Sequence, residues 1–352
     1  MGKQHRIAVI AGDGIGQEVI PAGKLVLEAA VGPDVHLDWT DLPWGTDLYH
    51  QTGALMPADG LDRLRNFEAI YFGAVGDPTL PDHLSLWGLL LPIRKTFDLY
   101  ANLRPIRLLP GVTGPLRDKT SRDIDMLVVR ENTEGEYAGV GGRVHTGTPH
   151  ETVIEAAVLS RFNLERVMRY AFELARRRRG HLTSITKSNA QQYTMVFWDE
   201  VVNEIAREYP DVEVSSLLVD AAAALMIRAP ERFDVVVASN LFGDILTDLG
   251  AAIMGSLGLA PSANLDPELR YPSLFEPIHG SAPDIAGKGI ASPLAAIWAG
   301  AMMLDHLGEE AASQRVMTAI EAVTASGQHM PPDLGGTANT REMTEAVLVA
   351  LR

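Results

Sequence analysis

The most informative segment of the chain reads Phe233-Asp-Val-Val-Val-Ala-Ser-Asn-Leu-Phe-Gly-Asp244-Ile-Leu-Thr-Asp248-Leu-Gly250. Its apolar residues 235–238 predict a buried strand, residues 239–243 a turn, and the segment from Asp244 the start of a helix. On that helix Asp244 and Asp248 would share one face, with their Cβ atoms about 5 to 6 Å apart. Carboxylates this close favour a shared hard cation such as Mg²⁺, Mn²⁺ or Ca²⁺. The alternative is that Asp244 stabilises the first turn of the helix and that Asp248 is a solvated surface residue.

The composition of the chain excludes several classes of protein. With 352 residues, 46% apolar and 21% charged, the chain is expected to form a globular protein of about two domains. The net charge of -15 argues against a general binder of nucleic acids or anionic membranes. The sequence has no cysteine, no evident signal peptide and no run of about 20 apolar residues that could span a bilayer. We therefore expect a cytoplasmic protein without disulfides or thiolate chemistry.

Strand-like and helix-like segments alternate along the chain, which predicts an α/β architecture with parallel strands. The expected strands are residues 6–10, 35–40, 69–72, 125–129, 182–186, 212–218 and 235–238. The expected helices are residues 17–30, 61–66, 154–178, 191–208, 221–228, 295–307, 309–325 and 341–351. The early turn Gly12-Asp-Gly-Ile-Gly16 lacks the last glycine of a dinucleotide-binding fingerprint, because Gln17 stands there. If a nucleotide binds, it binds in another way.

Three arginines lie in contexts suited to binding a carboxylate. Arg130 ends an apolar strand, where α/β sheets usually place their sites, and Arg94 and Arg104 lie in turn-bounded segments. Guanidinium groups are planar and can pair with carboxylates in bidentate fashion. Each arginine alone is more often a surface ion-pair partner. Together with the two aspartates they indicate a metal-bound polycarboxylate substrate.

Three further residues could complete an acid–base site. Tyr137, in a polar loop at residues 131–139, could act as a general acid, or it could simply pack its ring. Lys187 follows an apolar strand and could act as a base near a cation. Asp220 is expected at the end of the strand at residues 215–219 and supplies a third carboxylate.

Long motifs in the chain resemble those of the β-decarboxylating dehydrogenases, the family of isocitrate, 3-isopropylmalate and tartrate/D-malate dehydrogenases. The motifs are Asn240-Leu-Phe-Gly-Asp-Ile-Leu-Thr-Asp248, Gly255-Ser-Leu-Gly-Leu259 and Phe275-Glu-Pro-Ile-His-Gly-Ser-Ala-Pro-Asp284. The resemblance implies an isopropylmalate dehydrogenase-like α/β fold with two domains, a cofactor site unlike the Rossmann type, and an active site in the cleft between the domains. It implies a discontinuous cofactor-binding domain at residues 1–99 and 252–352, and a dimerisation and substrate domain at residues 100–251.

The resemblance also implies a reaction. NAD accepts a hydride from C2 of a 2-hydroxy acid, and the resulting β-keto acid loses CO₂ with the help of Mn²⁺ or Mg²⁺; K⁺ is an additional candidate cofactor. The implied metal ligands are Asp244, Asp248 and, from the partner chain of a homodimer or higher homo-oligomer, Asp220. Arg94, Arg104 and Arg130 would bind the substrate carboxylates, Lys187 would remove the hydroxyl proton, and Tyr137 would reprotonate the enol carbon.

The resemblance places the cofactor in a glycine-rich pair of loops. Asp284 matches the position that binds the adenosine ribose, and a carboxylate there would repel a 2′-phosphate, which favours NAD over NADP. Ser292 departs from the family, which often has asparagine before the following proline. The expected cofactor contacts are Gly73, Ala74, Val75, Gly76, Asn189, His279, Gly280, Ser281, Ala282, Asp284 and Ser292.

Substrate choice is expected to depend on the segment before Arg94. Trp87 stands where isopropylmalate enzymes typically carry glutamate, Leu90 stands four residues before the arginine, and the serine and asparagine of isocitrate enzymes are absent. The segment looks like that of the tartrate/D-malate group. The Trp87 indole could fill the pocket for the C3 substituent and leave room for only H or OH, or it could serve packing alone. The alternatives are a 3-isopropylmalate dehydrogenase and a non-catalytic regulatory subunit. The sequence contains no P-loop, which argues against an enzyme that acts on phosphates.

Overall fold

The computed structural model describes residues 2–352, and the chain divides into two compact units. Unit 1 contains the chain up to Leu99, Pro105–Ile124 and Ala251–Arg352, and unit 2 contains Tyr100–Arg104 and Asp125–Gly250. Pro105–Ile124 thus belongs to unit 1, although it lies in the sequence between the two segments of unit 2. The domain bounds expected from the sequence stay predictions. The cofactor and substrate roles expected for these units stay predictions.

The strands of unit 1 form a mostly parallel sheet in the order β2 (Val35–Asp41), β1 (Lys3–Gly12), β3 (Ala69–Ala74), β12 (Ser273–Pro277) and β11 (Pro261–Leu265). All residues of β3 are buried, as its apolar sequence predicts. β11 and β12 were not predicted, and they pair antiparallel. The chain between them is too short for a parallel crossover, and the Asp266 carboxylate closes it as a turn by accepting the backbone N–H groups of Arg270 and Tyr271.

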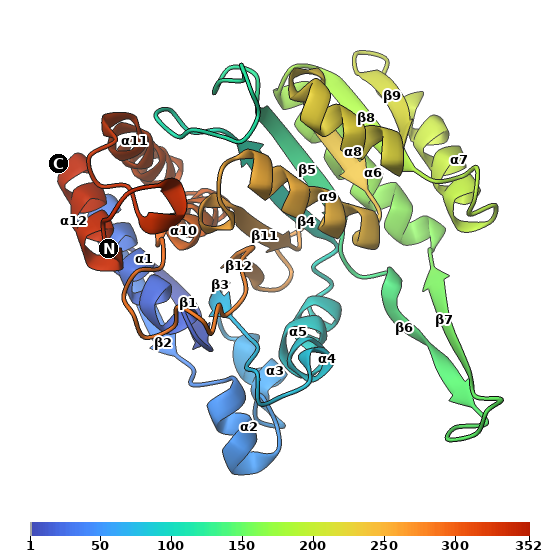
Figure 1. The fold of residues 1–352 in the computed structure, drawn as a ribbon, viewed down its shortest axis with the longest axis horizontal. Helices are drawn as coiled ribbons and strands as arrows, with labels where there is room; N and C mark the ends of the chain where they lie inside the picture. Colours follow the sequence, from blue (N-terminus) through green and yellow to red (C-terminus); the bar gives the residue numbers. More distant parts are fainter. Residues whose placement is uncertain (1) are drawn as a thin grey trace. The chain divides into compact units, whose positions relative to one another are not determined.

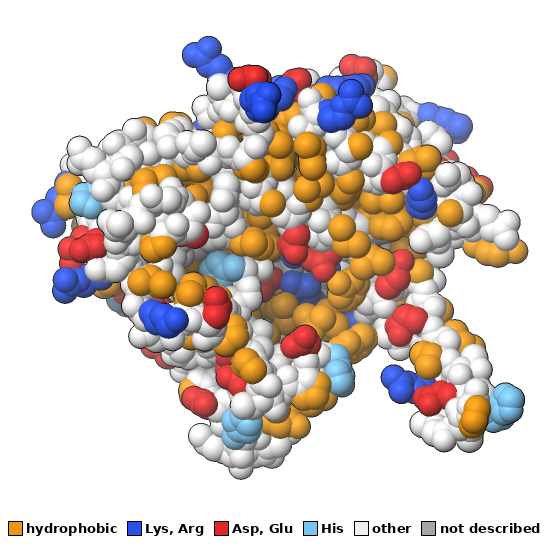
Figure 2. Space-filling view, in the orientation of Figure 1, with side chains coloured by type: hydrophobic (Ala, Val, Ile, Leu, Met, Phe, Trp, Pro, Cys, Tyr) orange, Lys and Arg blue, Asp and Glu red, His pale blue; other side chains and the backbone are white. Residues whose placement is uncertain are grey.

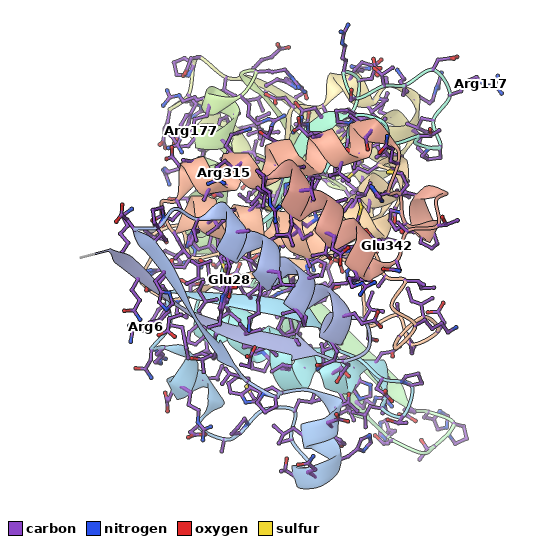
Figure 3. All side chains as sticks on the ribbon, turned by 90° about the vertical axis from the view of Figure 1, so that its left-hand side faces the viewer. Arg6, Glu28, Arg117, Arg177, Arg315 and Glu342 are labelled. Atoms are coloured by element: carbon purple, nitrogen blue, oxygen red, sulfur yellow. The ribbon has the colours of Figure 1, made fainter. Side chains whose placement is uncertain are left out.

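Four helices pack together in unit 1: α1 (Gly16–Ala30), α10 (Leu294–His306), α11 (Glu310–Ser326) and α12 (Thr340–Ala350). Figure 3 labels Glu28 on α1 and Arg315 on α11 and shows these helices side by side. The Arg315 guanidinium donates a hydrogen bond of 2.9 Å to the Ala30 carbonyl at the end of α1. The shorter helices of unit 1 are α2 (Thr46–Thr52), α3 (Gly60–Leu64), α4 (Asp82–Ser85), the π-helical turn η1 (Leu86–Leu90), α5 (Leu91–Thr96), η3 (Leu257–Leu259) and η4 (Pro332–Leu334).

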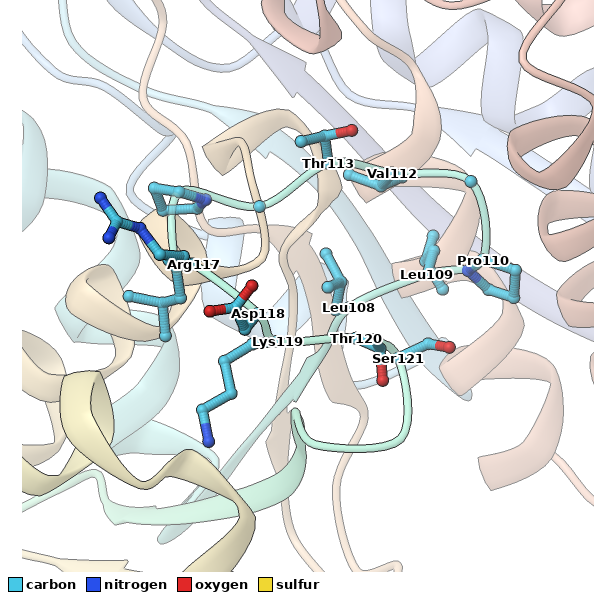
Figure 4. Close-up of a pocket in the computed structure, with 14 residues that line it drawn as sticks. Leu108, Leu109, Pro110, Val112, Thr113, Arg117, Asp118, Lys119, Thr120 and Ser121 are labelled. Carbon is cyan, nitrogen blue, oxygen red and sulfur yellow. The ribbon is translucent and has the colours of Figure 1, made fainter.

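The segment Pro105–Ile124 makes a ring-shaped loop after β4 (Ala101–Arg107), a strand that runs from unit 2 into unit 1. Figure 4 shows Leu108 inside this ring and Arg117 pointing away from it. The ring encloses a cavity of about 510 Å³. Its base is closed by a hydrogen bond of 3.1 Å from the Leu108 amide to the Ile124 carbonyl.

The strands of unit 2 form a parallel sheet in the order β5 (Asp125–Glu131), β10 (Val235–Ala238), β8 (His181–Thr186) and β9 (Glu213–Leu218). All four residues of β10 are buried, as its run of valines predicts. The helices of this unit are α6 (Arg161–Arg177), α7 (Thr194–Ala206), α8 (Val219–Arg228), the short η2 (Pro230–Arg232) and α9 (Asn240–Ile253). Figure 1 shows them together with the strands in green to orange.

Several expectations for unit 2 were wrong. The helix predicted from residue 154 begins only at Arg161, where the Ser160 side chain caps it by accepting the Asn163 amide. The preceding residues form β7 (Thr152–Val158), which pairs antiparallel with β6 (Gly135–Val144). β7 is rich in β-branched residues, which favour a strand over a helix, and the chain reverses between the two strands. This hairpin extends away from the remainder of unit 2 (Figure 1).

The helix predicted from Asp244 begins four residues earlier, at Asn240, so the turn predicted at residues 239–243 was also wrong. Asp244 therefore lies beyond the first turn of α9 and does not cap the helix. Asp220 lies in the first turn of α8 and not at the end of a strand. No helix among residues 2–352 combines the length and the apolar character needed to cross a membrane.

Candidate active site

A cluster of four side chains, which we call the Asp244 cluster (Arg104, Arg130, Tyr137 and Asp244), forms inside unit 2. Arg104 on β4 donates to Asp244 Oδ1 over 3.3 Å, and Arg130 on β5 donates to the same oxygen. Tyr137 on β6 donates its hydroxyl to Asp244 Oδ2 over 2.7 Å. The structure thus brings together three predicted site residues around one predicted metal ligand.

The two arginines of the cluster are buried and held by neighbouring polar groups. Arg130 Nε and Nη2 donate to Asn240 Oδ1 over 3.0 and 2.7 Å, and Arg104 Nη1 donates to Thr247 Oγ1 over 2.6 Å. Because Asn240 and Thr247 both lie on α9 with Asp244, this helix fixes the direction of both guanidinium groups. Neither Asn240 nor Thr247 was predicted as a site residue, although both stand in the segment of residues 233–250.

Gly243 explains how α9 comes so close to β5. A Cβ atom at this position would stand 2.7 Å from Arg130 Cγ and 2.8 Å from Arg130 Cβ, which is closer than real contacts allow. Glycine therefore lets α9 place Asp244 against Arg130. Glycine is a poor helix former in the absence of tertiary contacts, which is why a turn was predicted at this position.

Tyr137 is oriented by two contacts. Its hydroxyl binds Asp244, and the Arg130 guanidinium lies over its ring at 5.3 Å from the centroid. A cation over the ring attracts the aromatic face and keeps the phenol beside the carboxylate. The phenol is therefore placed next to the two guanidinium groups that are expected to bind substrate.

Asp248 lies one turn after Asp244 on α9, with a solvent-accessible side chain. Partial desolvation raises the pKa of Asp248, Arg104 opposes this shift, and the neighbouring charge of Asp244 adds to it. The charged form of Asp248 is thus disfavoured in the protein alone. A bound cation would reverse this preference, so the pair has the donor chemistry expected of a hard-cation site.

Lys187 and Asp220 form a second group in unit 2, which we call the Lys187–Asp220 pair. Lys187 follows β8, Asp220 begins α8, and their side chains form an ion pair of 2.9 Å. The hydrogen bond from Lys187 lowers the pKa of Asp220. The Asp220 side chain remains 66% exposed.

The three predicted metal ligands are not gathered into one site by a single chain. Within residues 2–352, no group of three or more His, Asp or Glu side chains is arranged so that it could hold a metal ion. Asp244 and Asp248 supply two carboxylates from adjacent turns of one helix. A hard divalent cation usually takes more oxygen ligands than these two residues provide.

Arg94 lies on α5 in unit 1, where it forms a buried ion pair. Its Nη2 donates to Glu276 Oε1 over 2.8 Å, and Asn264 Nδ2 donates to the same oxygen over 2.8 Å. In the described part of the chain, Arg94 Nε has no hydrogen-bond partner although it is buried. Glu276 and Asn264 were not predicted, because an ion pair between distant segments leaves no local signal in the sequence.

The segment before Arg94 presents Trp87 and Leu90 in different ways. Trp87 lies on the π-helical turn η1 and keeps 43% of its surface exposed, with the Lys95 ammonium 4.5 Å from its ring centroid. Leu90 is 8% exposed and packs in the core of unit 1 with Leu89, Ile93 and Phe97. The placement of Trp87 fits contact with a ligand, and that of Leu90 fits packing.

Three loops of unit 1 meet where the cofactor was predicted. The Ile15 amide donates to the Ser281 carbonyl over 2.9 Å, and the Asp13 amide donates to the Ala74 carbonyl over 2.8 Å. The Asp13 carboxylate accepts the Gly76 amide over 2.9 Å and so holds the second loop. The glycine turn that fails the dinucleotide fingerprint therefore still supports the predicted cofactor loops.

The residues after β12 fit a polar ligand. His279 Nε2 is buried and has no hydrogen-bond partner among residues 2–352, and burial lowers the pKa of His279, so the ring stays neutral. A ligand group is the ordinary partner for such an atom. Asp284 is exposed, whereas Ser292 is buried and donates to the Gly258 carbonyl over 3.2 Å. Asn189 lies exposed in unit 2, two residues after Lys187.

Comparison with known proteins places this chain in a family. The family model of isocitrate/isopropylmalate dehydrogenase matches residues 6–347. A probable tartrate dehydrogenase/decarboxylase of Agrobacterium vitis is 54% identical over 352 residues, which cover 99% of this chain and 96% of that protein. The D-malate dehydrogenase [decarboxylating] of Escherichia coli (strain K12) is 53% identical over 356 residues, covering 99% of this chain and 98% of that protein.

A solved structure gives the same result for the fold. The isocitrate dehydrogenase from Methylococcus capsulatus superposes with a TM-score of 0.89 at 39% identity, and the match covers 99% of both chains. The predicted isopropylmalate dehydrogenase-like α/β fold is confirmed. The protein is thus an enzyme that belongs to the isocitrate/isopropylmalate dehydrogenase family of decarboxylating dehydrogenases.

Proposed function

We propose that the enzyme oxidises and β-decarboxylates small 2-hydroxy dicarboxylic acids, namely tartrate and D-malate, with NAD and with Mn²⁺ or Mg²⁺, in the cytoplasm. The observation that carries this proposal is the convergence of Arg104, Arg130 and Tyr137 on the Asp244 carboxylate. A site that already seats one carboxylate between two guanidinium groups has the charge and geometry to bind a dicarboxylate. The names of two relatives, tartrate dehydrogenase/decarboxylase and D-malate dehydrogenase, favour the same substrates.

The substrate and Asp244 compete for the same guanidinium groups. In our proposal Arg104 and Arg130 turn part of their donors from Asp244 to the substrate carboxylates, while Asn240 and Thr247 keep both arginines in place. Asp244 and Asp248 are then available to hold the divalent cation with Asp220 of the partner subunit. When bound, that cation supplies Lewis-acid stabilisation of the negative charge that develops on the substrate oxygen.

The acid and base of the reaction come from the two groups in unit 2. Lys187 takes the proton of the C2 hydroxyl, and bound NAD⁺ supplies the acceptor for the C2 hydride. The bond from C3 to its carboxylate then breaks, CO₂ leaves, and Tyr137 gives a proton to C3. Each proton transfer needs its residue within hydrogen-bond reach of the reacting atom.

A second copy of the chain completes the site in this proposal. The Lys187–Asp220 pair is not grouped with Asp244 and Asp248 in one chain, and unit 2 carries exposed apolar residues that a partner could cover. Ile154 on the β6–β7 hairpin is 60% exposed, and Ile245 on α9 is 58% exposed. Figure 2 shows hydrophobic side chains along α8 and α9. Such apolar surface fits an interface of a homodimer or higher homo-oligomer.

NAD fits the loops of unit 1 by their chemistry. We propose contacts from the Gly73–Gly76 loop and from residues 279–284, with His279 Nε2 as a hydrogen-bonding group and Asp284 at the ribose. The exposed carboxylate of Asp284 would repel a 2′-phosphate, which favours NAD over NADP.

The indole of Trp87 is proposed to limit the substituent at C3. Its exposed ring and its place on a π-helical turn support a contact with substrate, since such turns are frequent at functional sites. A large alkyl group at C3 would then meet the indole. We expect H or OH at C3 to fit and an isopropyl group to be excluded.

A steady-state screen of the purified enzyme tests the proposal. We expect turnover of D-malate and at least one tartrate isomer with NAD⁺ and Mn²⁺, slower turnover with NADP⁺, and CO₂ release equal to NADH formed for D-malate. A K⁺ titration in the same assay tests that additional cofactor. A far higher kcat/KM for 3-isopropylmalate than for D-malate or tartrate would establish the alternative, a 3-isopropylmalate dehydrogenase. No turnover of any of these acids by a folded protein would favour a regulatory subunit.

A further inference from the structure

We propose that Glu131 is the positioning residue for Tyr137, and that its carboxyl group holds the loop before Tyr137 in the orientation needed for proton transfer. Glu131 is the last residue of β5, follows Arg130 directly, and has no exposed surface. The chain continues through a short loop into β6, where Tyr137 lies. The inference rests on the proposed role of Tyr137 as the acid.

One oxygen of Glu131 fixes the loop. Oε1 accepts hydrogen bonds from Thr133 N (2.7 Å), Thr133 Oγ1 (3.1 Å), Glu134 N (2.9 Å) and Asn163 Nδ2 (2.7 Å). The Thr133 and Glu134 donors belong to the loop, and Asn163 belongs to α6. A single buried acceptor therefore ties the loop to both β5 and α6.

A second contact holds the same loop from its carbonyl side. Asn240 Nδ2 donates to the Glu134 carbonyl over 3.1 Å, while Asn240 Oδ1 accepts from Arg130. The backbone of Glu134 is thus held at its N–H by Glu131 and at its C=O by Asn240. Arg130 and Glu131 are consecutive on a strand, so their side chains leave it on opposite faces. Strand β5, which supplies the proposed substrate-binding residue Arg130, therefore also holds the loop that leads to Tyr137.

The loop continues to Tyr137 with little freedom. Gly135 has φ of 72°, and a Cβ there would lie 3.4 Å from Asn240 Cβ. The Glu134 carboxylate accepts the Ser160 amide over 2.7 Å at the start of α6. A displacement of the Glu131 acceptor would therefore be transmitted to the Tyr137 phenol.

The hydrogen bonds to Glu131 depend on the position of the acceptor oxygen Oε1 and not on the charge of the carboxylate. Within residues 2–352, Glu131 Oε2 is buried and has no hydrogen-bond partner. Burial raises the pKa of Glu131, and the hydrogen bonds to Oε1 oppose that shift. An amide with its oxygen at the same place would serve the loop equally, whereas a shorter carboxylate would not.

The test separates position from charge with two variants and one reference. Glu131→Gln keeps the acceptor in place without the charge, Glu131→Asp keeps the charge and withdraws the acceptor, and Tyr137→Phe removes the acid itself. Stopped-flow NADH formation with D-malate, NAD⁺ and Mn²⁺ distinguishes early hydride transfer from the later protonation. In Glu131→Asp we expect a burst of about one NADH per site, followed by a steady rate reduced by about 10²-fold. Tyr137→Phe should give the same burst, and Glu131→Gln should restore the wild-type trace.

Each other outcome has a defined meaning. A burst in Tyr137→Phe with none in folded Glu131→Asp would overturn the role of Glu131. A burst in Glu131→Gln as large as in Glu131→Asp would also overturn it, because loss of the charge alone, with the acceptor in place, would then slow the protonation step. If Tyr137→Phe itself keeps wild-type kinetics, the proposed acid role fails instead. If Glu131→Asp does not fold, Thr133→Val, which removes one donor to Oε1, replaces it with a smaller expected burst, and its absence counts against the proposal.

Discussion

The Asp244 cluster and the Lys187–Asp220 pair both lie in unit 2. They differ in how extensively their charged groups are hydrogen-bonded and buried within one chain. In the cluster, Asp244 receives hydrogen bonds from two buried arginines and a tyrosine. In the pair, a single ion pair joins Lys187 to an aspartate that is 66% exposed. The cluster is integrated into the packing of α9 against β5, whereas the pair adds little to the packing. We therefore expect substitutions in the pair to reduce activity alone, and substitutions in the cluster to reduce both activity and stability.

Lys187→Ala is expected to have the largest effect on activity. Removal of a proposed general base lowers kcat by about 10²- to 10⁴-fold. The midpoint of urea unfolding should change little, because an ion pair to an exposed carboxylate is screened by solvent and contributes little to stability. Steady-state kinetics and urea titration of the same preparation measure both quantities. A large loss of stability would contradict the contrast between the two regions.

Arg130→Met tests how much the Asp244 cluster contributes to the free energy of unfolding. The substitution leaves Asp244 without one of its buried partners, and breaking a buried ion pair costs about 3 to 5 kcal/mol. Because Asp244 is partly exposed and keeps Arg104 and Tyr137, we expect a value near the lower end. Substrate binding should weaken as well. Unchanged unfolding free energy in urea would show that the cluster is not part of the packing.

Gly243→Ala tests the close contact between α9 and β5. The added methyl would stand 2.7 Å from Arg130 Cγ, and overpacking of this kind costs about 1 to 3 kcal/mol. Gly142→Ala on β6 is the matched control, since a Cβ there meets nothing within 4 Å. Thermal denaturation of both variants gives the comparison. Equal midpoints would mean that glycine is not needed at position 243.

The smallest expected effect concerns the pKa values of two aspartates. Asp248 has a raised pKa, so its contribution to stability is fully present below the ordinary pKa of aspartate and is lost as the pH rises through the raised value. Asp220 has a lowered pKa, so its contribution is present above the ordinary value and is lost as the pH falls through the lowered one.

Carboxyl ¹³C NMR titration measures both groups directly. We expect Asp248 to titrate above Asp220 in the protein alone, and Mg²⁺ to move the pKa of Asp248 downward. Asp248→Asn, which removes the disfavoured charge, should slightly stabilise the metal-free protein near neutral pH and reduce its stabilisation by Mn²⁺. Equal titration of the two aspartates, unaffected by Mg²⁺, would remove the distinction between the two regions.

Local pattern was sufficient for seven of the strands and for the shared helix face of two proposed site residues. The valine run of β10 predicted a buried strand, and the spacing of Asp244 and Asp248 predicted a shared helix face. The start of α9 was misplaced, because glycine at position 243 is explained only by its contact with Arg130. The β6–β7 hairpin was missed for a similar reason, since pairing between strands is not visible within either one.

The residues that support the site were the hardest to predict. Glu276 is a buried acid that pairs with Arg94 and Asn264 on other segments, and Glu131 is a buried acid that accepts from the loop after it and from Asn163 on α6. Nothing in the immediate sequence of either residue signals burial. Asp13 lies in a turn that was interpreted from its glycines alone, although the Asp13 carboxylate accepts a hydrogen bond from the Gly76 amide. Motifs therefore indicated the proposed reactive groups, and tertiary contacts were needed to find what holds them.

Mixed oligomers test the central claim, that the Asp244 cluster of one copy works with the Lys187–Asp220 pair of another. Two inactive variants, Tyr137→Phe and Lys187→Ala, are coexpressed with different tags, and the oligomer carrying both is purified. In a dimer of this kind one of the two sites is intact, so we expect about half the wild-type kcat per dimer. A mixture of Lys187→Ala with Asp220→Asn is the control and should stay inactive, because both changes affect the same contributed pair. No activity in the Tyr137→Phe and Lys187→Ala oligomer above that of its parents would contradict the account.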